Sequence, residues 1–154
     1  GFPTLPLAAA RPDLQITAID STAKKIAHVQ NTAHLFGFAN VNAIACRAEE
    51  LAQTKARESF DIATARAVSE LRILCEITLP FVKVGGAVLA MKGAAAREEL
   101  QEAQKAIKVL GLKLESVQEI SIDGTSHAVI VLRKVAPTPK QYPRRFAKIK
   151  QSPL

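Results

Sequence analysis

Several features that would assign this sequence to a class of protein are missing. Only two of its 154 residues are cysteines, and Cys46 and Cys75 lie far apart, each in an apolar segment. Such a pair forms neither a disulfide framework nor a metal-binding spacing, so we expect two buried structural side chains in a reducing compartment. No apolar run approaches the roughly 20 residues needed to span a bilayer, and no secretory pattern opens the chain. We therefore expect a cytoplasmic protein that does not enter a membrane.

A catalytic dyad is also missing. His28 and His34 are six residues apart on one expected helix, a spacing that does not place them on the same face. His127 falls in an expected hairpin turn. No pair of acids and no nucleophile with a neighbouring base emerges either, which makes a hydrolase a poor interpretation.

Acidic residues are absent from the last part of the chain. From residue 133 onward there are seven basic residues and no acidic one, whereas the other basic residues are balanced by all 14 acidic groups. The seven are Arg133, Lys134, Lys140, Arg144, Arg145, Lys148 and Lys150. A neutral body with a basic tail indicates a polyanionic partner, most simply nucleic acid. A solvated tail that only aids solubility is the alternative.

Strand and helix patterns alternate along most of the chain, with short connections. Short β-rich runs predict strands at Leu14–Ile19, Val41–Ala45, Phe60–Ala65 and Ala87–Met91. Helical spacing predicts a helix after each strand, the first between Ser21 as N-cap and Gly37, the others at residues 48–56, after residue 66 and at 95–110. This order indicates a parallel sheet covered on both faces.

Apolar stripes within the expected helices indicate which side chains face the core. The inward positions are Ile26, Val29, Ala33 and Phe36, then Val68, Leu71, Leu74, Cys75 and Leu79, and finally Leu100, Ala103, Ile107 and Leu110. Pro80 and the pair Gly85-Gly86 interrupt the chain before the strand at Ala87–Met91. That continuous apolar run is typical of a strand buried on both faces.

The end of the chain follows another pattern. Leu112–Ile122 and Ala128–Val135 are strand-like and separated by a short, turn-rich link, which permits only an antiparallel pair. A parallel sheet closed by such a hairpin is commoner among methyltransferases than among dinucleotide dehydrogenases. The proline-rich segment that follows is expected to be extended and not helical throughout. We therefore predict one α/β domain, residues 1–135, followed by a basic tail, residues 136–154.

Four residues follow the predicted strands directly, where open parallel sheets bind their ligands. Asp20 can accept hydrogen bonds from ribose hydroxyls, although an acid that begins a helix is equally expected there. Glu49 can accept an adenine amino group while the small Ala48 lets the base approach; the alternative is an exposed first-turn glutamate. Arg66 ends an apolar strand and must reach an anion, a cleft or a structural carboxylate.

Five short motifs occur in an order that resembles a known family. They are Gly1-Phe2-Pro3 with Pro6-Leu7-Ala8, Ile19-Asp20-Ser21 with Lys24-Lys25, Arg47-Ala48-Glu49-Glu50, Phe60-Asp61 with Thr64-Ala65-Arg66-Ala67, and Tyr142-Pro143-Arg144-Arg145 with Pro153-Leu154. Together they resemble the small-subunit ribosomal-RNA guanine-N7 methyltransferases, also called the glucose-inhibited division protein B family. The Tyr-Pro-Arg-Arg motif is the most specific, and the resemblance covers essentially the whole chain.

The resemblance implies a Rossmann-like class I methyltransferase sheet and S-adenosylmethionine as cofactor. Carried over by position, the cofactor-binding residues are Phe2, Asp20, Ser21, Ala48, Glu49 and Arg66. The residues implied for RNA binding are Arg144, Arg145, Lys148 and Lys150. The expected partner is the ribosomal RNA of the small subunit, and the expected state is a monomer without a metal.

The chain departs from the family pattern in two ways. Thr4 stands where the family has glycine. The family's first strand, its Gly-rich turn and an N-terminal helical region are missing before Gly1, and the chain opens without methionine, so we expect a processed protein or a fragment. A buried central strand contributes on the order of 10 kcal/mol, comparable with a whole domain's stability of roughly 5–15 kcal/mol. We expect the chain alone to be unstable, inactive and a poor cofactor binder.

The implied reaction agrees with the missing dyad. Guanine N7 has an in-plane lone pair and carries no proton, so methyl transfer to it needs alignment and not a general base. Two alternatives stay open from the residues alone. Asp20 could equally serve the ribose of NAD in an oxidoreductase, and the basic tail could belong to a non-catalytic RNA-binding module.

Overall fold

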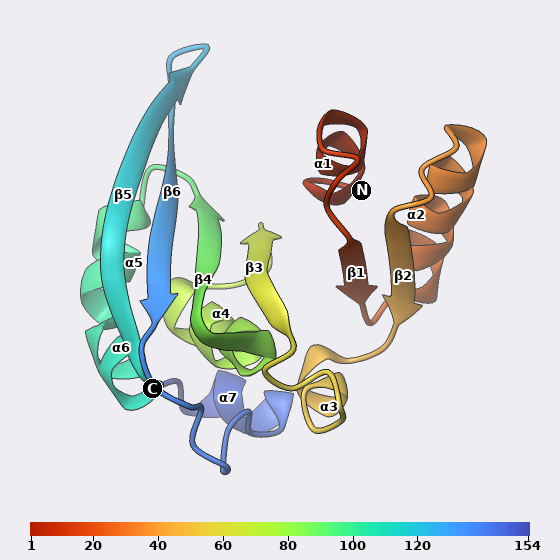
Figure 1. Cartoon of the computed structure of the whole chain (residues 1–154). Helices are drawn as coiled ribbons and strands as arrows, with labels where there is room; N and C mark the ends of the chain where they lie inside the picture. Colours follow the sequence, from red (N-terminus) through yellow and green to blue (C-terminus); the bar gives the residue numbers. More distant parts are fainter. The chain divides into compact units, whose positions relative to one another are not determined.

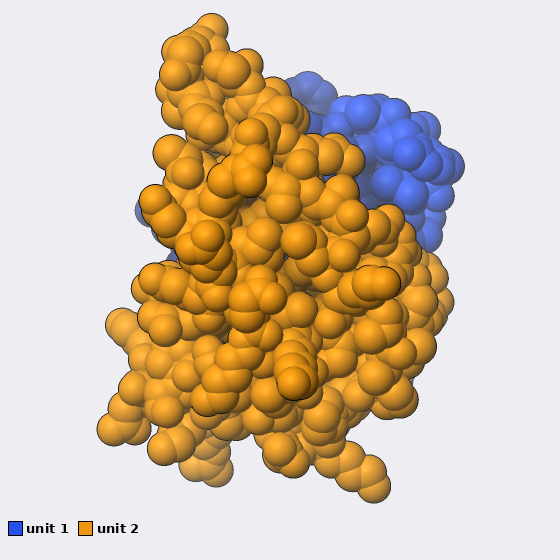
Figure 2. Space-filling model, turned by 90° about the vertical axis from the view of Figure 1, so that its left-hand side faces the viewer, with its two compact units in different colours: residues 1–51 blue, residues 52–154 orange.

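The computed structural model describes residues 1–154 and divides the chain into two compact units, unit 1 (residues 1–51) and unit 2 (residues 52–154). Figure 1 shows the elements of each unit, and Figure 2 shows the surfaces of the two units in different colours. Residues 136–154, which their composition separates from the body as a tail, belong to unit 2. The division of function between residues 1–135 and the tail stays a prediction. None of the helices is both long and apolar enough to cross a membrane.

Unit 1 contains two parallel strands and three helices. The elements are α1 (Thr4–Ala10), β1 (Ile16–Asp20), α2 (Ala23–Leu35), β2 (Val41–Ala45) and α3 (Ala48–Leu51). β1 and β2 pair in parallel along their whole length, from Ile16 with Val41 to Asp20 with Ala45. Both strands and α2 confirm the sequence prediction. α1 was not predicted, and the helix expected at residues 48–56 ends at Leu51.

The apolar stripe of α2 explains its position against the strands. Ile26, Val29 and Ala33 are buried as predicted, because spacings of three and four place them on one helix face. The prediction for Phe36 is wrong: α2 ends at Leu35, and Phe36 is 65% exposed and stacks on Phe38. Gly37 has a φ of +69°, a left-handed conformation that glycine adopts readily at a helix end.

Ser21 does not cap α2 as predicted. The residue at the N-cap is Thr22, whose side chain makes no capping hydrogen bond. The carboxylate of Asp20 instead accepts a hydrogen bond from the backbone N–H of Thr22 at 2.8 Å. An acid at this place satisfies a donor at the helix start, which is why the serine hydroxyl is not needed there.

Unit 2 contains a four-stranded sheet whose helices α4, α5 and α6 lie along one face (Figure 1). Its elements are β3 (Phe60–Arg66), α4 (Leu71–Thr78), the 3-10 helix η1 (Leu79–Phe81), β4 (Val82–Lys92), α5 (Ala96–Glu102), α6 (Gln104–Val109), β5 (Leu112–Ile122), β6 (Thr125–Lys134) and α7 (Phe146–Gln151). The strand order is β3-β4-β6-β5, with β3 and β4 parallel and the other pairs antiparallel. The predicted fold class, an α/β sheet with parallel strands and a C-terminal antiparallel hairpin, is confirmed.

The core of unit 2 lies between the sheet and its helices. The predicted core residues Leu71, Leu74, Cys75 and Leu79 are all buried. Val68 was predicted to face inward but is 59% exposed, because α4 begins only at Leu71 and the preceding residues form a loop.

Three boundaries in unit 2 differ from the sequence prediction. The helix expected at residues 95–110 is broken at Ala103 into α5 and α6. Gly85 and Gly86 lie inside β4 and do not precede it, and a Cβ at Gly86 would collide with the backbone oxygen of Asp61. His127 lies in β6 opposite Ile120, because the hairpin turn is only Asp123-Gly124, both with positive φ.

Candidate cofactor-binding edge and basic arm

In unit 1, the carboxyl ends of the two strands lie side by side. Asp20, the last residue of β1, pairs with Ala45, the last residue of β2. The backbone N–H of Cys46 donates to the carbonyl oxygen of Asp20 at 3.1 Å, which extends the ladder past the end of β2. Ala48 and Glu49 follow within four residues of Ala45, at the start of α3. The structure therefore places Asp20 and the Ala48-Glu49 pair at the same edge of one parallel sheet, where ligands of such sheets bind.

The carboxylate of Asp20 is held by two local partners. One oxygen accepts the Thr22 N–H, and the other lies 3.3 Å from Lys25 Nζ. Burial raises the pKa of Asp20, but the hydrogen bonds from Thr22 and Lys25 outweigh burial, so its pKa is lowered. Asp20 is therefore ionised at neutral pH, and its side chain stays 34% exposed. Asp20 therefore accepts the backbone hydrogen bond at the start of α2 and still presents its oxygens to solvent.

The side chain of Glu49 is only 11% exposed, in the first turn of α3. It forms an ion pair with Arg47 Nη1 that is long, at 3.9 Å. Nearby, burial and then the charges of Glu50 and Glu49 raise the pKa of the Cys46 thiol. The expectation of an exposed first-turn glutamate is therefore wrong. This edge presents a sheltered carboxylate and a negative potential, which suit amino and hydroxyl donors and a cationic ligand.

Two further residues of the predicted cofactor set lie in unit 1. Ser21 is exposed in the turn between β1 and α2. Phe2 is 67% exposed and precedes α1. The roles of both in cofactor binding stay predictions.

Arg66 is the last residue of β3 in unit 2 and pairs with Met91 of β4. It therefore lies at the carboxyl end of these parallel strands, as predicted, and it is exposed. Ala67, the next residue, has a φ of +53°, so the chain turns sharply directly after Arg66. Because Arg66 and Asp20 belong to different units, their convergence on one ligand stays a prediction.

A partly buried network that the sequence did not indicate holds the loop after Arg66. Lys92 Nζ, at the end of β4, donates to the carbonyl oxygen of Ser69 and lies 2.6 Å from Glu99 Oε2. Glu99 also accepts the backbone N–H of Leu71 at 2.7 Å. The side chain of Lys92 is only 8% exposed, so this charge has a structural role. The network joins three elements, β4, α4 and α5. In the sequence, the only indication of it is an acidic residue in the first turn of a predicted helix.

The segment after β6, which we call the basic arm (residues 135–154), is not a free tail. Arg57 donates to three of its carbonyl oxygens: Tyr142 at 2.8 Å, Thr138 at 2.9 Å and Pro139 at 3.3 Å. Its last part forms the six-residue helix α7, whose Ile149 is fully buried. The prediction of an extended segment is therefore wrong for residues 146–151, although the arm as a whole is not helical.

Lys134, the last residue of β6, is fully buried and directly precedes the basic arm. Its Nζ donates to Glu58 Oε1 at 2.5 Å, to the Val82 carbonyl oxygen at 2.7 Å and to Thr138 Oγ1 at 2.7 Å. Burial lowers the pKa of Lys134, and the bond to Glu58 opposes that effect. All three donors of this ammonium are satisfied internally, so its charge is not available to a partner.

Arg144 is paired with Glu76, a carboxylate of α4 that is completely buried. Glu76 Oε1 accepts the backbone N–H and Nε of Arg144 at 2.9 and 2.8 Å, and Oε2 accepts Nη2 at 2.6 Å. The guanidinium also lies over the Tyr142 ring. This two-point pairing gives Arg144 a structural role. Its predicted role in RNA binding stays a prediction.

The other cations predicted to bind RNA have no such partner. Arg145, Lys148 and Lys150 are exposed, and none of them takes part in an ion pair. Lys140, also in the basic arm, is exposed and unpaired in the same way. Arg133 is bound by Glu115. Of the seven basic residues noted in the sequence, four are therefore available to a polyanion.

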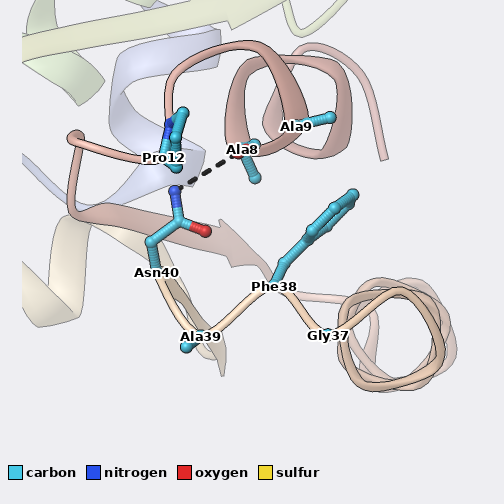
Figure 3. A pocket seen from close by; sticks show the side chains of 7 residues that line it. All are labelled: Ala8, Ala9, Pro12, Gly37, Phe38, Ala39 and Asn40. Atoms are coloured by element: carbon cyan, nitrogen blue, oxygen red, sulfur yellow. Dashed lines mark hydrogen bonds between the residues drawn. The ribbon is translucent and has the colours of Figure 1, made fainter.

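A shallow pocket of about 310 Å³ lies in unit 1 (Figure 3). It is lined mainly by small apolar residues between α1 and the α2–β2 connection, Ala8, Ala9, Pro12, Gly37, Phe38, Ala39 and Asn40. Asn40 directly precedes β2, and its Nδ2 donates to the Ala8 carbonyl oxygen. The pocket thus lies at the amino ends of the strands, whereas Asp20 ends β1. It is not part of the candidate cofactor-binding edge.

The family model of rRNA small subunit methyltransferase G matches residues 1–129. The chain belongs to this family. It is 43% identical over 157 residues to the ribosomal RNA small subunit methyltransferase G of Clostridium beijerinckii, an alignment that covers 100% of this chain and 66% of the relative. The Leuconostoc citreum protein of the same name is also 43% identical, over 156 residues, with 100% of this chain and 65% of the relative covered. The chain thus spans about two thirds of the length of these relatives.

Solved structures support the fold. The chain resembles M. jannaschii TYW2 in complex with AdoMet, with a TM-score of 0.68 and 17% identity over 88% of this chain and 65% of that chain. It also resembles a 16S rRNA (adenine(1408)-N(1))-methyltransferase mutant from Catenulisporales acidiphilia, with a TM-score of 0.65 and 14% identity over 87% of this chain and 79% of that chain. At these identities the likeness concerns the fold alone. Membership of a methyltransferase family leaves the oxidoreductase alternative without support.

Proposed function

We propose that this chain carries the cofactor-binding edge and an RNA-binding surface of an S-adenosylmethionine-dependent methyltransferase that modifies guanine N7 in small-subunit ribosomal RNA. The observation that carries the proposal is the register of β1 and β2. It places Asp20 and the sheltered Glu49 at one carboxyl edge in a chain of this family. The name of these relatives supplies the substrate class.

The donor set at this edge fits the adenosine part of the cofactor. Asp20 presents carboxylate oxygens that can accept ribose hydroxyls, and Glu49 can accept the adenine amino group beside the small Ala48. Ser21 and Phe2 are proposed to line the same site, with Arg66 beside it. When bound, S-adenosylmethionine would supply a methyl group activated by its bond to a positively charged sulfonium sulfur. The negative edge at Asp20, Glu49 and Glu50 attracts that charge.

No side chain of the described edge is required to move a proton. Guanine N7 presents a lone pair and has no hydrogen to lose, which agrees with the absence of a nucleophile–base pair in the sequence. The residues at the edge therefore act by holding and orienting the two reactants and by excluding water. The target base must be exposed or extruded, because N7 of a paired guanine lies in the deep, narrow groove of an RNA duplex.

The partner in this proposal is the ribosomal RNA of the small subunit, bound by a monomer in the cytoplasm. RNA binding is supported by the exposed cations of the basic arm and by the absence of any acidic residue after residue 133. Cations without internal partners can replace the counterions of phosphates.

A chimera tests the function in a chain of full family length. In it, residues 1–154 replace the aligned part of the Clostridium beijerinckii relative, and small-subunit ribosomal RNA that lacks the modification is supplied with methyl-labelled S-adenosylmethionine. We expect label in 7-methylguanine after acid hydrolysis. The unmodified relative serves as the active control.

Two outcomes would count against the proposal. A folded chimera that binds the RNA but transfers no label indicates a non-catalytic RNA-binding module. Label on another base or another atom shows that the guanine-N7 assignment is wrong while methyl transfer stands. Glu49→Ala in the chimera is expected to lower kcat/KM by roughly 10- to 150-fold, the loss of one hydrogen bond to a charged group.

A further inference from the structure

We propose that the basic arm is a fixed anchor for the RNA backbone at the amino-terminal end of the unit 2 sheet, at the opposite end of that sheet from Arg66. The proposal rests on the proposed function for the identity of its ligand, single-stranded or looped RNA. It assigns the phosphate contacts to Lys140, Arg145, Lys148 and Lys150, and it excludes Arg133, Lys134 and Arg144.

The bonds that hold the basic arm determine its place in unit 2. Thr138 N–H donates to Glu58, which precedes β3, and Lys134 donates to the carbonyl oxygen of Val82, the first residue of β4. Figure 1 shows α7 beside the end of the sheet at which β4 begins. Arg66 lies at the other end of β3, whose seven residues span about 20 Å at roughly 3.3 Å per residue. The basic arm and Arg66 are therefore at opposite ends of the same sheet.

The basic arm is held rigidly by charged side chains. Arg57 binds three of its carbonyl oxygens, and Gln53 Nε2 donates to a fourth, that of Pro143, at 3.2 Å. Farther along, the Glu76–Arg144 pair and the buried Ile149 fix the start and the middle of α7. A surface that is already ordered loses little conformational entropy when it binds a ligand. The exposed cations are therefore presented by a preformed surface.

The positions of the free cations suit an extended polyanion. Arg145, at the start of α7, and Lys148 are three residues apart and share one side of the helix, and Lys150 lies beyond the buried Ile149. Lys140 lies on the segment before them, and Lys55, also exposed, follows Gln53 of the segment that binds the arm. No acidic side chain belongs to the basic arm. An acidic protein surface is the competing ligand, and the absence of large exposed hydrophobic side chains on α7 favours the RNA backbone.

The distance has a consequence for the RNA. At about 3.4 Å per phosphate along one strand, 20 Å corresponds to roughly six nucleotides. An anchor at that distance contributes to RNA affinity but does not contact the reacting base. Loss of the anchor should therefore raise KM for RNA and leave kcat unchanged.

The first experiment measures binding and needs no chemistry. The chimera described above, in which residues 1–154 stand in a chain of full family length, is titrated against a fluorescent 25-nucleotide RNA that contains a loop, at several salt concentrations, by fluorescence anisotropy. Four phosphate contacts at roughly 0.7 each contribute about 3 to the slope of log affinity against log salt. The variant Lys140→Gln/Arg145→Gln/Lys148→Gln/Lys150→Gln should lose most of this contribution. Arg133→Gln is the control, because Arg133 lies in β6 just before the basic arm and is already paired with Glu115. It should leave the slope unchanged.

Three results would overturn the proposed anchor. A slope that is unchanged in the quadruple variant, with its circular dichroism spectrum intact, overturns the anchor. An equal loss of slope in Arg133→Gln shows that the contacts are not specific to the basic arm and also overturns it. Binding of an acidic peptide of equal charge as tightly as RNA shows that the partner is wrong.

The second experiment separates the anchor from the methyl transfer. In the chimera described above, Lys148→Gln/Lys150→Gln should raise KM for the 25-nucleotide RNA by roughly 5-fold or more at unchanged kcat. With an RNA that has only two nucleotides on each side of the target base, the same variant should have no effect. A fall in kcat would instead place the cations at the reacting edge. A chimera that is inactive but shows the predicted change of salt slope contradicts the proposed function and leaves the anchor standing.

Discussion

The two units differ sharply in how their side chains are packed. In unit 1 the buried apolar residues are few and mostly small: Ala8, Ala18, Ile26, Val29 and Ala33. In unit 2 the fully buried side chains include many large ones: Leu71, Leu74, Leu79, Val82, Val88, Leu110, Ile130, Leu132 and Ile149. Burial of each large apolar side chain stabilises a fold by about 1.5–3 kcal/mol. Unit 2 therefore has a core that unit 1 lacks.

This difference separates the two parts of the proposed function. Five of the six predicted cofactor-binding residues, Phe2, Asp20, Ser21, Ala48 and Glu49, lie in unit 1, whose sheet has two strands and little core, and isolated sheets of this size are marginally stable. The cations proposed to bind RNA lie on a segment that is bonded to a well-packed sheet. Ligand binding is expected to order unit 1 more than unit 2, because binding stabilises the folded state that it selects.

The largest expected difference concerns the two cysteines, one in each unit. Burial raises the pKa of Cys75 to about 12, and that thiol is completely buried in unit 2. Cys46 in unit 1 is only partly buried. At pH 8 we expect iodoacetamide to modify Cys46 at least about 1,000 times faster than Cys75. Only the thiolate reacts, and the Cys75 thiol becomes accessible only when the core of unit 2 opens. Mass spectrometry of timed samples measures both rates, and comparable rates would show that unit 2 opens as readily as unit 1.

The next largest effect is expected from Arg144→Ala. This change leaves the buried carboxylate of Glu76 without its partner, and breaking a buried ion pair costs about 3–5 kcal/mol. Urea denaturation should show this decrease in the free energy of unfolding of unit 2. Arg145→Ala, at the neighbouring exposed position, is the matched control and should change it by less than about 0.5 kcal/mol. Equal effects of the two changes would contradict a structural role for Arg144.

A smaller effect is expected from Asp20 as the pH falls. Its pKa is lowered in the folded chain, so its ionised form stabilises unit 1 above the unfolded pKa, about 3.9, and this contribution is lost as the pH falls through the folded pKa. Asp20→Ala should remove that acid dependence and, because the Thr22 N–H loses its acceptor, cost about 1 kcal/mol at neutral pH. Amide hydrogen exchange of α2, measured between pH 3 and 7 with correction for intrinsic rates, tests it. An identical pH dependence in the variant would refute the assigned role of the carboxylate.

The smallest effect is expected from Phe36→Ser. Phe36 is 65% exposed beyond the end of α2 and packs mainly on Phe38. Its replacement should change the free energy of unfolding of unit 1 by less than about 0.5 kcal/mol, whereas Ile26→Ala in the buried stripe should cost roughly 2–5 kcal/mol. Thermal unfolding of both variants checks the comparison. A large loss for Phe36→Ser would show that the stripe ends one turn later than the structure indicates.

The regular elements could be predicted from the sequence because they depend on local patterns. The β-rich and apolar runs identified every strand of the two sheets, and Gly37 marked a helix end with positive φ. Asp20, Glu49 and Arg66 were found by one rule about strand ends. The break at Ala103 and the exposed Val68 were missed, because helical spacing continues through both positions and only packing decides where a helix begins.

The roles of individual charges could not be predicted. Arg133, Lys134, Arg144, Arg145, Lys148 and Lys150 look alike in the sequence, and nothing local separates those that bind internal carboxylates from those that face solvent. Glu58 and Glu76 lie 76 and 68 residues from Lys134 and Arg144 in the chain. Only the tertiary structure shows these pairs.

Binding of S-adenosylmethionine by the chimera tests the central claim most directly, and calorimetric titration measures it. Glu49→Ala and Asp20→Ala, which remove the acceptor oxygens, should each weaken the affinity by roughly 10- to 150-fold, the equivalent of about 1.5–3 kcal/mol for a hydrogen bond to a charged group. Arg133→Gln should leave it unchanged. Undiminished affinity in both carboxylate variants, with the fold intact, would show that the cofactor binds elsewhere.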